Sequence, residues 1–198
     1  MDPAIAPAVA SNIALTIVLG DYAHARTLGS GTTLRHGAQS VTLRRVTDKP
    51  SALFRQARET PPPFDVTEMS LATTYVLADQ GDSTFRALPV FPSRSFRHSA
   101  FYVRDPALQP KALRGKRVGV VRYGMTAAVW ARALLQTQYG IAPQDVTWWI
   151  GEPQFFEPPG ITLHAAKDND GMGGKAALEA MLLAGELDCL FSVDEPEA

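Results

Sequence analysis

The sequence predicts an α/β fold with mostly parallel strands, divided into two lobes. Residues 13–19 (IALTIVL) form a nearly continuous apolar run that stops at residues 20–22 (GDY), a pattern typical of a strand buried on both faces of a parallel sheet. Strand-like and helix-like segments then alternate along the chain, which favours parallel or mixed sheets flanked by helices. The alternation restarts near residue 100, which indicates a second lobe.

The first half of the chain contains further short strands and two helices. Short apolar or alternating segments predict strands at residues 40–46, 64–69, 87–91 and 99–103. Helical spacing predicts helices at residues 51–59 and 71–80, and the prolines at 61–63 end the first of them.

The second half contains the clearest helix, at residues 126–139. Its apolar residues share one face, and Gly140 follows as the expected C-cap. Weaker patterns predict helices at 106–113 and 176–184, the latter stopped by Gly185, and strands at 117–121, 146–150, 161–164 and 188–193. In the strand at 146–150, Trp148 and Trp149 alternate, so we expect one of them in the core.

Composition excludes several classes of protein. The 198 residues are 45% hydrophobic and 20% charged, which is ordinary for one globular domain or two small ones. A net charge of −1 argues against a protein that binds nucleic acid or a membrane surface. Cys189 is the only cysteine, which excludes a disulfide framework within the chain and a cysteine-based zinc site.

We also expect no targeting signal in this sequence. It has no apolar run of about 18 residues, the length that a membrane-spanning helix needs. Residues 8–10 (AVA) resemble the end of a secretory signal, but the first basic residue is Arg26, so the basic start of such a signal is absent. We therefore expect a disordered tail at residues 1–12 and a cytoplasmic protein.

Ligands of open parallel sheets bind beyond the carboxyl ends of the strands. Four segments follow predicted strands in this way: residues 20–22, 67–70, 91–94 and 122–126. The candidate ligand-binding residues in them are Asp21, Tyr22, Ser70, Ser93, Arg94, Tyr123, Met125 and Thr126. Thr126 begins a helix, where free N–H groups and the helix dipole favour an anion; the alternative is that it merely caps that helix.

Two further features suggest proton transfer and anion binding. Arg94, Arg97 and His98 stand within five residues, and together they would clamp a carboxylate and supply a proton; the alternative is a solvated loop. Glu68 has apolar neighbours, so it is either a general acid or base or an ordinary partner of an arginine. The sequence has no metal-binding motif.

Several strings together resemble the 4,5-dihydroxyphthalate decarboxylase family, whose fold is similar to that of the type II periplasmic solute-binding proteins. The resemblance runs in order through most of residues 13–192, and the second and fourth strings are the most specific. They are FDVTEMS (64–70), PVFPSRSFRHSAFYV (89–103), LRGKRVGV (113–120), YGMTAAVWARALLQTQYG (123–140) and MLLAGELDCLFS (181–192).

The resemblance implies two α/β lobes that close on a ligand between them. Lobe one would span residues 13–95 and lobe two residues 104–190, with a hinge strand at 96–103 and the start of a return to lobe one at 191–198. Family members continue beyond this point, so lobe one is expected to be incomplete, with an unpaired sheet edge that invites aggregation or pairing into a homo-oligomer.

The resemblance also implies a reaction. The family removes one carboxylate from 4,5-dihydroxyphthalate, giving protocatechuate and CO2 in phthalate degradation, and we expect no cofactor. Arg94 and Arg97 are then predicted to clamp the substrate, with the helix start at Thr126 as a second anion site. His98 is the first candidate for proton transfer and Glu68 the second. The expected partner is thus a small aromatic dicarboxylate.

Two other functions stay open. The first is a solute-binding protein of the transporter type for an aromatic or other organic anion. The expected absence of a secretory signal argues against it. The second is an inactive fragment of the family.

Overall fold

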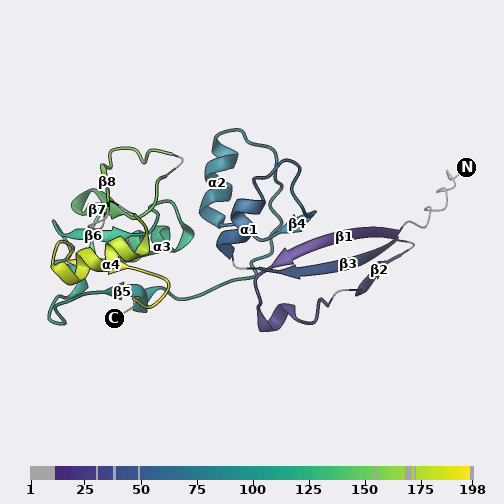
Figure 1. Cartoon of the computed structure of the whole chain (residues 1–198), viewed down its shortest axis with the longest axis horizontal. Helices are drawn as coiled ribbons and strands as arrows, with labels where there is room; N and C mark the ends of the chain where they lie inside the picture. Colours follow the sequence, from purple (N-terminus) through teal and green to yellow (C-terminus); the bar gives the residue numbers. More distant parts are fainter. Residues whose placement is uncertain are drawn as a thin grey trace, which may run out of the picture. The chain divides into compact units, whose positions relative to one another are not determined.

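The computed structural model describes residues 12–29, 31–37, 39–48, 50–154, 156–167, 171 and 173–196. The chain divides into two compact units: unit 1 comprises Met1–Ser70 and Ser83–Arg94, and unit 2 comprises Leu71–Asp82 and Ser95–Ala198. The predicted tail lies outside the described residues except for Asn12, which begins the first strand. Each unit contains one mixed sheet with helices, so the predicted α/β class is confirmed (Figure 1).

Unit 1 is built on a four-stranded sheet of order β2-β3-β1-β4. Its strands are β1 (Asn12–Leu19), β2 (Thr33–His36), β3 (Gln39–Thr47) and β4 (Val66–Thr67). Strands β3 and β4 pair parallel to β1, and β2 pairs antiparallel to β3. The unit also contains helix α1 (Pro50–Gln56), whose Leu53 is fully buried, and the 3₁₀ turn η1 (Ala23–Ala25).

Unit 2 has a five-stranded sheet of order β5-β9-β6-β7-β8, in which only β5 runs antiparallel to its neighbour. Its strands are β5 (Phe101–Tyr102), β6 (Arg117–Val120), β7 (Thr147–Ile150), β8 (Leu163–Ala165) and β9 (Cys189–Phe191). Its helices are α2 (Leu71–Asp79), α3 (Thr126–Tyr139) and α4 (Lys175–Ala184), with 3₁₀ turns η2 (His98–Ala100), η3 (Pro110–Ala112) and η4 (Pro143–Asp145).

The sheet of unit 2 has a core on each face because alternate side chains of its strands point to opposite sides. Trp148 lies in one core with apolar residues of α3, and Trp149 packs against the other, which contains apolar residues of α4. The prediction of a core tryptophan is thus confirmed for Trp148. Gly140 and Gly185 end α3 and α4 in the left-handed region, with φ of 67° and 79°, as the sequence indicated.

Four details of the predicted secondary structure are wrong. The predicted strand at 87–91 is irregular, because Pro89 offers no N–H to a ladder and the described residues there lie exposed. The predicted helix at 106–113 contains only η3, which begins at Pro110. The predicted strand at 99–103 is shorter in the structure, where η2 is followed by the two-residue strand β5. Strand β2 was not predicted, because all four of its residues are exposed and show no apolar alternation.

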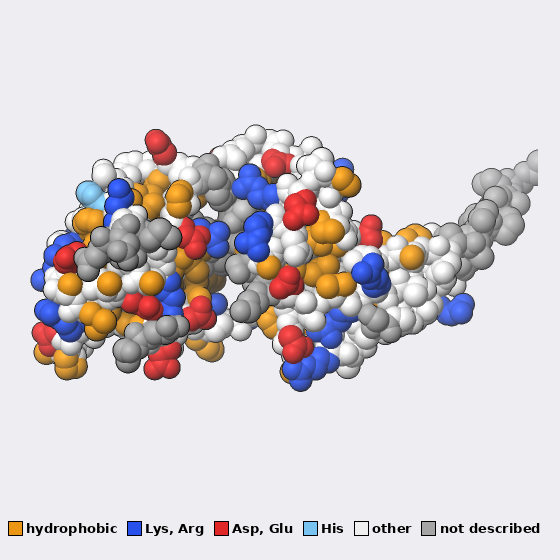
Figure 2. All heavy atoms as spheres, in the orientation of Figure 1, with side chains coloured by type: hydrophobic (Ala, Val, Ile, Leu, Met, Phe, Trp, Pro, Cys, Tyr) orange, Lys and Arg blue, Asp and Glu red, His pale blue; other side chains and the backbone are white. Residues whose placement is uncertain are grey.

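Charged side chains of both signs are interspersed over the face seen in Figure 2, as the near-zero net charge suggests. Within the described part of the chain, no helix has both the length and the apolar character needed to cross a membrane.

The core under α4 yields a stability prediction. Leu178→Ala should lower the free energy of unfolding by about 2–5 kcal/mol, because Leu178 is fully buried and its truncation leaves a cavity. Leu183→Ala, on the same helix but 65% exposed, should change it by less than about 0.5 kcal/mol. Urea unfolding followed by tryptophan fluorescence measures both, since all three tryptophans lie in unit 2. An equal decrease in the free energy of unfolding for the two variants would contradict the packing of α4.

Candidate functional site

Glu68 is placed by the pairing of β4 with β1 in unit 1. Its backbone N–H donates to the carbonyl of Val18 over 3.2 Å, which continues the parallel ladder by one residue beyond β4. Glu68 is only 8% exposed. Its carboxylate accepts two hydrogen bonds, from the backbone N–H of Gly20 (3.3 Å) and from the hydroxyl of Tyr22 (2.9 Å). A buried carboxylate thus lies at the carboxyl end of β1.

Tyr22 connects Glu68 to a third predicted residue. Its hydroxyl donates to Glu68 and also hydrogen-bonds the Ser93 side chain. The ring packs so closely on Gly20 that a Cβ there would lie 2.8 Å from it, which explains why glycine stands at this position. Burial, and secondly the hydrogen bond to Glu68, raise the pKa of Tyr22. The structure therefore brings Tyr22, Glu68 and Ser93 together from three of the four predicted strand ends.

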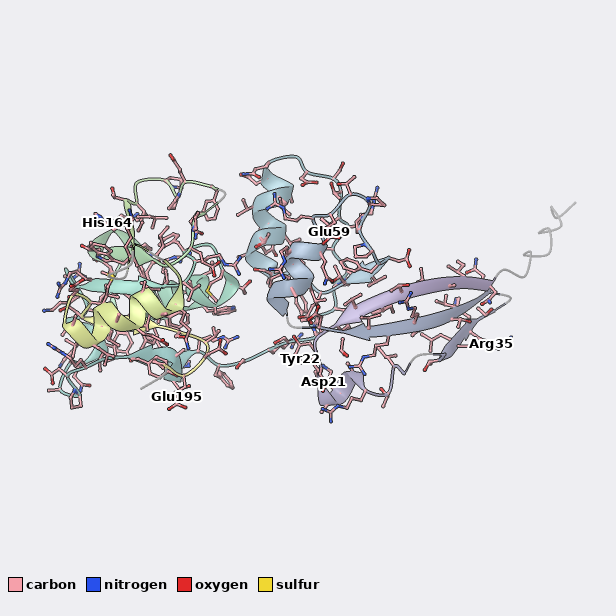
Figure 3. The ribbon with its side chains drawn as sticks, viewed as in Figure 1. Asp21, Tyr22, Arg35, Glu59, His164 and Glu195 are labelled. Carbon is pink, nitrogen blue, oxygen red and sulfur yellow. The ribbon has the colours of Figure 1, made fainter. Side chains whose placement is uncertain are left out.

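Asp21 is engaged elsewhere. Its exposed carboxylate accepts two hydrogen bonds from Arg26, of 3.2 and 3.0 Å, and lies 3.7 Å from the guanidinium of Arg45. The hydrogen bond from Arg26 is the main reason why the pKa of Asp21 lies below its ordinary value. Asp21 and Tyr22 are neighbours in the turn after β1 (Figure 3), but only Tyr22 contacts Glu68.

Sequence reasoning missed Arg45, whose side chain is only 12% exposed. A signal for it existed, because the alternation of β3 places Arg45 on the same face as the buried Leu43. Two other predicted residues of unit 1 are more exposed than Glu68. Ser70 is half-buried and lies directly before α2. Arg94 is exposed, and its guanidinium lies 5.3 Å from the centre of the Phe91 ring. Their roles stay predictions.

In unit 2, the structure places Tyr123 in the core. It is 4% exposed, its ring meets Trp148 edge-on at 5.5 Å, and the guanidinium of Arg132 lies 3.7 Å from the ring centre. Burial raises the pKa of Tyr123. We expected Tyr123 to face a ligand, but its ring is enclosed by protein, and only the backbone of this residue follows β6 as predicted.

Thr126 is the first residue of α3. The N-cap of α3 is Met125, whose side chain makes no capping hydrogen bond and packs against the core. The hydroxyl oxygen of Thr126 instead accepts the backbone N–H of Ala72 over 3.1 Å, which joins the first turns of α2 and α3. Both the capping interpretation and the anion-site prediction for Thr126 stay predictions.

His98 lies at the other end of α3. One of its ring nitrogens is 3.2 Å from the side-chain nitrogen of Gln138, which follows Thr126 by twelve positions, or about 18 Å along a helix. The structure therefore does not bring His98 and Thr126 together, although the sequence predicts both in one site. Arg97, half-buried, is the residue before η2.

His98 instead contributes to a cavity of about 240 Å³ inside unit 2. Most of its lining residues are apolar, and Cys189 forms part of the wall. Burial raises the pKa of the Cys189 thiol to about 12, so this thiol is uncharged near neutral pH. Among the residues that the structure describes, no group of three histidine, cysteine or acidic side chains is arranged to hold a metal ion.

The contact between Tyr22 and Glu68 predicts a measurable titration. Glu68→Gln should lower the pKa of Tyr22, because a charged acceptor is lost, while burial keeps that pKa above its ordinary value of 10.0. In the wild type, the neutral phenol stabilises the fold below pH 10.0, and this contribution is lost as the pH rises through the raised pKa. Ultraviolet titration of the tyrosines measures the shift, and Tyr22→Phe identifies the signal. An unchanged titration in Glu68→Gln would contradict the contact.

Comparison with known proteins identifies two similar curated sequences, whereas no model of a protein family matches the chain. A 4,5-dihydroxyphthalate decarboxylase of Pseudomonas putida is 33% identical over 195 residues, which cover 96% of this chain and 74% of that protein. A 4,5-dihydroxyphthalate decarboxylase of Comamonas testosteroni is 34% identical over 197 residues, covering 94% of this chain and 57% of that protein. The predicted resemblance is thus confirmed, and the chain belongs to the 4,5-dihydroxyphthalate decarboxylase family.

Proposed function

We propose that this protein decarboxylates 4,5-dihydroxyphthalate, or a closely related hydroxylated aromatic dicarboxylate, to protocatechuate and CO2 without a cofactor. The names of the two relatives support the reaction class, and the substrate is proposed by analogy with them. The observation that carries the residue assignment is the buried Glu68 carboxylate hydrogen-bonded to the Tyr22 hydroxyl at the carboxyl ends of β1 and β4.

The substrate defines what the protein must supply. Each carboxylate of 4,5-dihydroxyphthalate is para to a hydroxyl. When a base takes the proton of that hydroxyl, electron density moves through the ring to the carbon that bears the carboxylate, and that carbon accepts a proton. The bond to the carboxylate then breaks, its electron pair restores the aromatic ring, and CO2 leaves. The phenolate finally regains a proton, so one proton is consumed overall.

Tyr22 and Glu68 are suited to the first of these steps. The Tyr22 oxygen would accept the substrate's phenolic proton while its own proton moves to the Glu68 carboxylate, with which it already forms a hydrogen bond. Ser93 would orient the Tyr22 hydroxyl from the other side. Tyr22 is then the catalytic residue, and Glu68 acts through it.

The carboxylates need separate binding groups. We assign one of them to Arg94 of unit 1, whose guanidinium can bind a carboxylate with two hydrogen bonds. His98 is no longer the first candidate for proton transfer, because its partner Gln138 lies near the far end of α3 from Thr126.

Glu68→Gln and Tyr22→Phe should each lower kcat about 100-fold or more while changing KM little, because both remove the proton acceptor but keep the side-chain shape. Glu59→Gln, which neutralises an exposed carboxylate of unit 1, is the matched control and should leave kcat unchanged. Protocatechuate and CO2 are followed together with 4,5-dihydroxyphthalate as substrate.

Three results would overturn parts of this proposal. Absence of turnover in the wild type would reject the reaction for this chain. Undiminished turnover in Glu68→Gln would remove the Tyr22–Glu68 pair from the mechanism. A loss in His98→Ala, with Glu68→Gln fully active, would return proton transfer to His98.

A further inference from the structure

We propose that the cavity inside unit 2 is a binding site for a small, uncharged and mostly apolar molecule that is about the size of one aromatic ring and carries a hydroxyl group. The cavity has a volume of about 240 Å³. All of its lining residues belong to unit 2, whereas Tyr22 and Glu68 belong to unit 1. The inference therefore stands independently of the proposed function.

Two strands, one helix and one loop of unit 2 form the walls of the cavity. Phe101 of β5 and Cys189 of β9 come from neighbouring strands of the sheet. The last turns of α3 and the loop around η3 supply further apolar side chains, among them Leu135 and Leu113, which are almost fully buried. Because this loop contains only the short turn η3, it leaves space between itself, α3 and the sheet.

The lining favours an uncharged ligand. Most of it consists of leucine, valine, phenylalanine and proline side chains, and none of the described residues that line it is a lysine, an arginine or a carboxylate. The Cys189 thiol in the wall is also uncharged near neutral pH, since burial raises its pKa to about 12. A charged ligand would lose its hydration here, which is costly when no opposite charge compensates it.

One side of the cavity is polar and opens to solvent, because the lining residues His98 and Gln138 are exposed. The side-chain nitrogen of Gln138 lies 3.2 Å from a ring nitrogen of His98. An amide nitrogen only donates, so the ring nitrogen accepts, which requires an uncharged imidazole. The amide of Gln138 also has an oxygen, which can accept a hydrogen bond from a hydroxyl. A ligand hydroxyl is therefore assigned to this side, with the apolar part of the ligand inside.

The volume of the cavity is sufficient for one ring with a small substituent. An apolar protein cavity of about 150 Å³ is large enough to bind benzene, and the cavity of unit 2 is larger, at about 240 Å³. An unfilled apolar cavity lowers stability, because the atoms that line it lose packing contacts. A ligand that restores these contacts also removes its own apolar surface from water, which favours binding.

The test titrates phenol, benzene and benzoate into the full chain and measures binding by calorimetry. Phenol should bind at one site, and benzoate should bind at least about tenfold more weakly because its charge would lose hydration. Gln138→Met removes the hydrogen-bonding amide at similar size, so it should weaken phenol binding about fivefold and leave benzene binding nearly unchanged.

Leu134→Trp places a larger side chain in the lining and should weaken phenol binding about tenfold or more. Leu183→Trp is the matched control, because it makes the same substitution at a position of α4 that is 65% exposed, and it should leave phenol affinity unaltered. In the wild type, nuclear Overhauser effects from phenol to the methyl groups of Leu113 and Leu135 should locate the ligand without any substitution.

Four results would overturn the inference. A folded wild-type protein that binds neither phenol nor benzene would reject the site, and so would benzoate binding as tight as that of phenol. Undiminished phenol binding in a folded Leu134→Trp variant would place the ligand elsewhere. If that variant does not fold, Overhauser effects to leucines of unit 1 alone would reject the site, whereas contacts to Leu113 and Leu135 would support it.

Discussion

The register between β1 and β4 is the constraint on which the candidate site of unit 1 depends. Ile17 pairs with Val66 and Val18 with Thr67, which brings Glu68 beside the end of β1. Because side chains alternate along a strand, a slip of one residue would turn Glu68 to the opposite face of the sheet and separate it from Tyr22. Gly20 adds a second condition, since any larger residue would displace the Tyr22 ring.

In unit 2, the backbone that leaves strand β6 leads into helix α3. Apolar cores cover both faces of the sheet of unit 2, and α3 packs in one of them. A short turn joins β6 to this helix. Tyr123 anchors that turn by burying its ring between Trp148 and Arg132. Gln154 holds the same turn through the Gly124 N–H. The residues that make the turn rigid are thus different from those that would contact a ligand.

The predictions of secondary structure were most accurate where a pattern within one short segment determines the structure. Helix α3 was predicted with its observed bounds because its apolar face and Gly140 are both local. For the candidate site, the strand-end rule selected Tyr22 and Ser93, and its apolar neighbours selected Glu68. Nothing in the sequence indicated that the three share one chain of hydrogen bonds. The surroundings of Tyr123 and His98 could not be predicted, since the aromatic packing that buries Tyr123 and the contact of His98 with Gln138 join residues far apart in the chain.

The proposed decarboxylation replaces the lost carboxylate by a proton on the ring carbon. The most direct measurement is to incubate the purified protein with 4,5-dihydroxyphthalate in D2O and to analyse the products by NMR and mass spectrometry. We expect equal amounts of CO2 and protocatechuate, with one deuterium on the carbon that carried the lost carboxylate. Unchanged substrate with a folded protein would contradict it.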